Sequence, residues 1–119
     1  MKAIYLLTAF TFLLSHSSKA QSIGDISLSE IKSEYIELHI LGLIGKKGMQ
    51  VGIDFGQENE PLSLKDQLLV NEKGKAMAFN SKMDVLNFMF ENGYELEQIY
   101  VIPTETSGND YYVLKRKKE

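Results

Sequence analysis

Apolar and polar residues alternate on both sides of a short glycine–lysine segment, and this alternation constrains the fold more than any other feature. In residues 34–44 (EYIELHILGLI) and 49–56 (MQVGIDFG), apolar side chains recur at every second position, which is the spacing of a strand with one buried face. Only GKKG, residues 45–48, lies between them, and glycines give a tight turn the backbone freedom that it needs. The pattern predicts a β-hairpin.

The alternation also suggests a register for this hairpin. Pairing Ile44 with Met49 brings the apolar residues of one strand opposite apolar residues of the other. A slip of one residue would send one apolar set to the wrong face. The same register places His39 opposite Asp54 on the other face of the sheet.

The segment LIGKKGMQV, residues 43–51, also resembles the GXXG loop with which KH domains clamp an RNA backbone. That loop joins two helices, so apolar residues would have to recur at helical spacing on both sides. Here both flanks alternate at every second residue, which favours the hairpin over the RNA-binding loop.

Residues 80–92 (NSKMDVLNFMFEN) form the clearest helical pattern. Ser81 is suited to cap the first turn, and Asp84 three residues later completes a capping box. Gly93 stands where a helix commonly ends. The apolar stripe expected to face the core consists of Val85, Leu86, Met89 and Phe90.

Two further strands, residues 94–102 and 110–117, are predicted to form a second hairpin around PTETSGN. Pairing Ile99 with Val113 places Glu97 and Glu95 opposite Lys115 and Lys117, which favours that register modestly. In the same register Tyr100 lies opposite Tyr112.

These elements predict an α+β fold: a mostly antiparallel sheet from two β-hairpins in ββ-x-α-ββ order, with one main helix packed on one face. The sequence pattern does not determine the secondary structure of residues 57–79. Short strands at 68–70 and 76–79 around the turn 71–74 (NEKG), or an extended crossover, both fit it.

Residues 1–20 carry the features of a signal peptide. Lys2 precedes a twelve-residue apolar run, and Ser18 and Ala20 supply the small residues of a cleavage site. We therefore expect an exported protein, periplasmic or secreted and bacterial, with a cleaved signal peptide (1–20), a loosely ordered lead-in (21–33) and a single α+β domain (34–117).

The amino-acid composition limits the classes of partner that we expect this protein to bind. The absence of cysteine excludes disulfides and attachment of lipid at a cysteine. Cleavage would remove Lys2 and Lys19 but no acidic residue, changing the net charge from −3 to −5, which disfavours binding to nucleic acid. After cleavage, no remaining apolar run approaches membrane-spanning length.

The sequence DVLNFMFENGYELEQIYVI, followed by YYVLKRK, resembles a group of small exported bacterial α+β domains of unknown function. Their pattern is a helix with Leu-Asn, then Gly, an aromatic residue, Glu, an aliphatic residue and a strand, closing on a tyrosine-rich strand with basic residues. IDFGQ at 53–57 and FNS at 79–81 belong to the same likeness. The resemblance covers about residues 34–117 and implies this fold. It implies no activity, cofactor or catalytic residue.

The candidate catalytic pair is His39 and Asp54, since a histidine beside a carboxylate can act as a general base. The other interpretation is a polar cross-strand pair, because no nucleophile is placed beside them. No metal-binding motif includes them or the nearby Glu58 and Glu60, and no cofactor is expected.

The candidate binding residues lie in the last hairpin: Tyr100, Tyr111, Tyr112, Lys115 and Arg116. Both faces of this hairpin are rather apolar, so either both are covered, the interpretation we favour, or one is an exposed patch for a partner. The basic run at 115–118 (KRKK) could attract an acidic partner, or could keep a strand end from edge pairing.

The leading hypothesis is an exported, non-enzymatic domain that acts by contact with another protein or with itself, as a protein-interaction or self-association module. The alternatives are small-ligand binding in a groove beside Tyr100 and Tyr112, and a small enzyme that uses His39 and Asp54.

Overall fold

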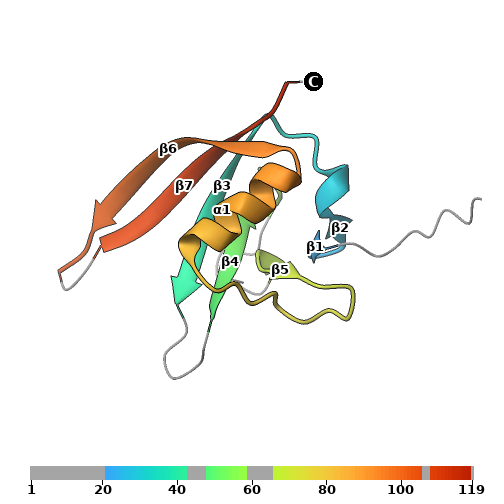
Figure 1. The fold of residues 1–119 in the computed structure, drawn as a ribbon, viewed down its shortest axis with the longest axis horizontal. Coiled ribbons are helices and arrows are strands. Elements are labelled where there is room, and N and C mark those ends of the chain that lie inside the picture. The colour runs from blue at the N-terminus through green and yellow to red at the C-terminus, as the bar shows by residue number, and fades with distance from the viewer. Residues whose placement is uncertain (1–20, 43–47, 59–65, 106–107, 119) are drawn as a thin grey trace, which may run out of the picture.

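The computed structural model describes residues 21–42, 48–58, 66–105 and 108–118. The predicted signal peptide and most of the GKKG segment lie outside the described residues. Within them, one α-helix and seven strands form two antiparallel sheets. The α+β class and the two antiparallel hairpins are as predicted, whereas the second sheet was not predicted. Figure 1 shows the elements: β1 (Ser22–Ile23), β2 (Ile26–Ser27), the 3-10 helix η1 (Leu28–Glu30), β3 (Tyr35–Gly42), β4 (Met49–Asp54), β5 (Leu69–Val70), α1 (Lys82–Glu91), β6 (Tyr94–Pro103) and β7 (Gly108–Arg116).

The main sheet has the strand order β4-β3-β7-β6, so the two predicted hairpins join side by side through β3 and β7. Helix α1 lies across one face of this sheet, and the β6–β7 hairpin extends beyond the end of the helix (Figure 1). The core lies between helix and sheet because that face carries fully buried side chains: Ile36, Leu38, Val51, Ile53, Val85, Met89 and Leu114. The face of the sheet remote from α1 is called the open face below.

The first hairpin forms, but its register differs from the prediction by two residues. Leu38 lies opposite Ile53, and the pairing ends with Gly42 opposite Met49. A period-two pattern cannot distinguish registers that differ by two, because every side chain keeps its face. Both segments that flank GKKG are strands, not the helices that a KH loop requires.

The predicted register of the last hairpin is wrong. Ile99 lies opposite Tyr112 and Tyr100 opposite Tyr111, while nearer the helix Glu95 lies opposite Lys115. The register changes between Leu96 and Gln98, where a β-bulge inserts one extra residue. No regular pairing can therefore hold along the whole hairpin.

The helix begins and ends as predicted. The Ser81 Oγ accepts a hydrogen bond from the Asp84 N–H at 3.1 Å, and the Asp84 carboxylate accepts one from the Asn80 N–H at 3.0 Å. Gly93 has a φ of +96°, which suits glycine at the end of a helix. Phe90, predicted to be buried, is 52% exposed, and Phe88 packs against Phe79 instead.

The predicted loose lead-in is a structured part of the domain, which corrects the proposed start at residue 34. Strand β1 pairs with both β2 and β5 to form the second, smaller sheet. Ile23, Leu28 and Ile31 are buried. Their spacing follows neither the strand period nor the helix period, because a turn and a 3-10 helix separate them, so periodicity alone could not reveal them.

The segment after residue 66 contains the turn that the sequence suggested. Val70 bridges to Ala76, and the Asn71 side-chain oxygen accepts hydrogen bonds from the N–H groups of Lys73 and Lys75. Of the two predicted short strands, one forms as β5, whereas residues 76–79 contribute only isolated bridges at Ala76 and Phe79.

The two edges of the main sheet are unlike. The outer side of β4 is partly covered, because Met49 pairs with Phe79 and Gly52 with Leu68. At the other edge, β6 pairs only with β7 among the strands that the structure describes. β6 is thus the free edge of the sheet.

Candidate functional site

A row of stacked rings crosses the open face. The ring centroids of His39 on β3 and Tyr111 on β7 are 4.9 Å apart, and those of Tyr111 and Tyr100 on β6 are 5.2 Å apart. The planes are inclined by 29° and 17° respectively. Because the rings stand against one another, their stacked faces are mostly covered by their neighbours. This aromatic row ends at Tyr100, on the free edge.

A short hydrogen bond fixes the end of the row. The Tyr100 hydroxyl donates to the Glu37 carboxylate at 2.6 Å, which connects β6 to β3 across the intervening β7. This bond to a carboxylate favours the protonated phenol and raises the pKa of Tyr100 to about 12. Tyr100 therefore remains a neutral hydrogen-bond donor over the physiological pH range.

The predicted catalytic pairing does not form. His39 lies opposite Gly52, and Asp54 lies opposite Glu37. The Asp54 carboxylate instead accepts the Gly56 N–H at 2.9 Å, and the His39 ring stacks on Tyr111. The shallow hollow beside Asp54 does not include His39 among its lining residues. The two-residue difference in register separates the pair.

Tyr100 and Tyr112, predicted to line one groove, cannot do so together, because these side chains lie on opposite faces of the sheet. Tyr112 is only 4% exposed and belongs to the core beneath α1. Tyr111 takes the place beside Tyr100 on the open face. The one-residue slip beyond the bulge exchanges the faces of the two neighbouring tyrosines.

The basic residues of the last strand lie against aromatic rings. Lys115 is 5.6 Å from the centre of the Tyr35 ring, Arg116 is 5.8 Å from that of Tyr94, and Lys117 is 3.7 Å from that of Phe90. Lys115 lies within the sheet, paired with both neighbouring strands. The basic run therefore does not protect a free strand edge, in contrast to one of the two predicted interpretations.

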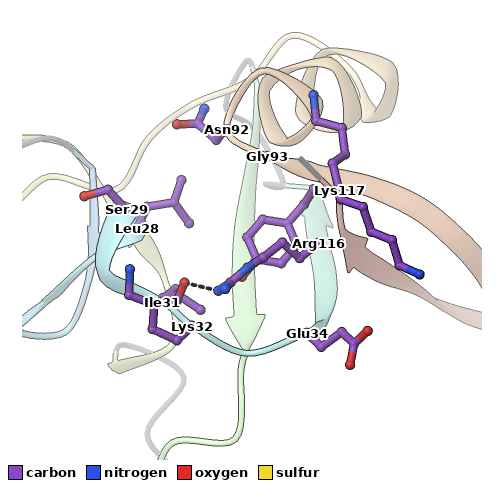
Figure 2. A pocket seen from close by; sticks show the side chains of 11 residues that line it. Leu28, Ser29, Ile31, Lys32, Glu34, Asn92, Gly93, Arg116 and Lys117 are labelled. Atoms are coloured by element: carbon purple, nitrogen blue, oxygen red, sulfur yellow. Dashed lines mark hydrogen bonds between the residues drawn. The ribbon is translucent and has the colours of Figure 1, made fainter.

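A hollow of about 960 Å³ lies between the lead-in, the end of α1 and the C-terminal strand. Figure 2 shows Arg116 in this hollow, bonded to the backbone carbonyl of Ile31. The Tyr94 hydroxyl donates to the Ser33 carbonyl at 3.0 Å. Both side chains thus attach the lead-in to the last hairpin. Lys32 and Lys118 are the exposed cations of the lining.

Strand β6 exposes apolar side chains on its helix-bearing face. Leu96 and Ile99 lie opposite the core residues Leu114 and Tyr112, which places them on that face. Leu96, Ile99 and Val101 are 43%, 48% and 54% exposed. The predicted covering of this hairpin is therefore wrong: the hairpin extends past α1 (Figure 1) and leaves these side chains open to solvent.

One flank of α1 continues this surface. The Lys82 ammonium bonds the Asp110 carboxylate on β7 at 2.8 Å, and Phe90 lies beneath Lys117, which follows β7. This flank therefore faces the last hairpin, while Phe88 on the opposite flank contacts Phe79. Met83 lies seven residues, about two turns, before Phe90 and therefore projects from a similar side of the helix. We call the combined surface the apolar band; it consists of Met83, Phe90, Leu96, Ile99 and Val101.

Comparison with protein-family models, with curated proteins and with solved structures finds no match for this chain. Among the described residues, no group of three or more histidine, cysteine or acidic side chains is placed to hold a metal ion. No helix in the part of the chain that the structure describes is long and apolar enough to cross a membrane.

Proposed function

We propose that this chain is a small exported, non-enzymatic domain that binds another protein chain along β6. The observation that carries the proposal is a free edge strand whose Ile99 and Val101 are each about half exposed.

The binding mode that suits β6 is the addition of a strand. An edge strand presents unpaired N–H and C=O groups, to which an extended segment can bond. Alternate side chains of the added strand would lie on the face that carries the apolar band. Main-chain hydrogen bonds would then supply the attachment, and burial of Ile99 and Val101 would supply much of the affinity.

Site-specific cross-linking in the producing cell tests this proposal. A photoreactive residue in place of Gln98, which is exposed on β6, should give a discrete cross-linked adduct. The same residue in place of Lys73, exposed in the turn after β5, is the matched control and should give none.

The adduct must also depend on the apolar band. Adding Ile99→Lys to the Gln98 variant should abolish the adduct, because a charge would have to be buried in the contact. An adduct that survives this change, or the absence of any adduct from position 98, would contradict the proposed binding surface.

A further inference from the structure

We propose that the chain that binds β6 is a second copy of the same protein, paired antiparallel about a two-fold axis at Tyr100. This inference rests on the proposed function and names its partner. The pairing would join two four-stranded sheets into one of eight strands.

The segment of β6 that can pair regularly with another strand has two clear ends, and these ends define the register in which two copies would pair. The bulge at Glu97 ends regular pairing on one side, and Pro103, which has no N–H to donate, ends it on the other. Between them lie the five residues 98–102, and Tyr100 is the middle one. An antiparallel pair that uses this whole segment in both copies must place Tyr100 opposite the partner's Tyr100.

The side chains match in that register. On the helix-bearing face, Ile99 lies opposite the partner's Val101, and the pair occurs twice by symmetry. Moving the axis one residue, to Ile99, would place Val101 opposite the partner's Glu97, at the bulge. Moving it to Val101 would place Ile99 opposite the partner's Pro103. Only the axis at Tyr100 places both Ile99 and Val101 opposite apolar residues that belong to the partner's regular segment, 98–102.

The aromatic row gives an independent reason. Tyr100 ends the row of His39, Tyr111 and Tyr100 at the free edge. Placing two copies of Tyr100 opposite each other continues the row across the joint, so that six rings would cross the open face. Paired aromatic side chains on neighbouring strands are among the more stabilising cross-strand contacts.

The charges favour an antiparallel arrangement of two copies. Glu95 and Glu97 both lie at the start of β6, and the strand has no basic residue. Parallel pairing in register would place these acidic residues opposite their copies, which is destabilising. Antiparallel pairing moves them to opposite ends of the joint.

The symmetry also covers the central part of the apolar band. A two-fold axis perpendicular to the sheet keeps both helices on the same face. Ile99 and Val101, each about half exposed in a single copy, would contact the partner strand on that face. Leu96 and Phe90 lie toward the outer ends of the joint, because Phe90 contacts Lys117 beside the start of β6.

Sedimentation of the purified protein over a range of concentrations tests the pairing. The native protein should sediment as a dimer that dissociates on dilution, and Ile99→Lys with Val101→Lys should sediment as a monomer at every concentration. Ile26→Lys, which changes an exposed apolar residue on β2, should remain dimeric. Circular dichroism and urea unfolding should show that all three are folded.

The register is tested by cysteine variants, since the native chain has no cysteine. Facing residues of an antiparallel pair have Cα atoms within disulfide range. Tyr100→Cys should therefore form a disulfide-linked dimer under mild oxidation, whereas Ile102→Cys, which would lie opposite the partner's Gln98, should not. A linked Ile102→Cys dimer without a linked Tyr100→Cys dimer would overturn this register.

The outcomes separate this inference from the proposed function. A native monomer at all concentrations, together with a position-98 adduct of a mass other than twice the chain, would overturn self-pairing and leave binding along β6 intact. A monomer that gives no adduct would overturn both.

Discussion

The hydrogen bond from the Tyr100 hydroxyl to the Glu37 carboxylate is the residue-scale contact with the clearest electrostatic consequence. It holds the pKa of Tyr100 at about 12, above the ordinary value of 10. The folded state therefore retains this proton more strongly than the unfolded state. The stabilisation is fully present below about pH 10 and is lost as the pH rises through the range from 10 to 12.

Replacing Glu37 with Gln should lower the pKa of Tyr100 toward 10, because the amide gives no negative charge opposite the phenol. The ultraviolet absorbance of tyrosinate, followed against pH, measures this, and Tyr100→Phe identifies which titration belongs to this residue. An unchanged titration in the Glu37 variant would show that the carboxylate is not the cause.

Gly93 is the second residue-scale case, because its φ of +96° is one that side chains rarely adopt. We expect Gly93→Ala to lower the free energy of unfolding by about 1–2 kcal/mol. Gly42→Ala is the matched control, since Gly42 has no such φ and an added methyl group would meet nothing within 4 Å. Equal losses in urea unfolding of the two variants would exclude backbone strain at Gly93.

At the scale of elements, the lead-in behaves as part of the core rather than as a tail. Leu28 in η1 is 3% exposed, whereas Ile26 in β2 is 37% exposed. Leu28→Ala should therefore lower the free energy of unfolding by about 2–4 kcal/mol, and Ile26→Ala by clearly less. Urea unfolding measures both. No loss from the Leu28 substitution would indicate a detached lead-in.

The elements also show which features could be predicted from sequence. Ser81, Gly93 and Asn71 act on groups a few residues away, so their cap and turn roles were predictable. The position of β6 at the edge was not, because it depends on β3 pairing with a strand more than 70 residues later. The bulge at Glu97 could not be predicted either, and it determines which face of the sheet Tyr100 occupies.

The candidate site, like the elements, was only partly predictable from the sequence. The sequence singled out His39 as a catalytic candidate and Tyr100 and Tyr111 as binding candidates, but their stacking depends on two registers that alternation alone could not fix. The apolar side chains of β6 were predicted to be covered, but they are exposed because the hairpin extends beyond α1 (Figure 1). How far the hairpin extends depends on how the helix and the sheet pack together, which alternation along one strand does not show.

At the scale of the whole molecule, β7 is the strand on which the fold depends. It pairs with both β3 and β6 and supplies the buried Tyr112 and Leu114. Ending the chain at residue 107 should therefore abolish the cooperative unfolding transition and the sheet signal in circular dichroism. Ending it at Lys117 should preserve both, and loss of structure in this shorter deletion would point to the last two residues instead.

The covered outer side of β4 sets a limit on growth. Because Met49 and Gly52 already pair with Phe79 and Leu68 there, the part of the main sheet that the structure describes offers no second edge as bare as β6 to a further chain. The dimer would therefore remain a finite complex and would not add further copies edge to edge, as the strands of a fibril do.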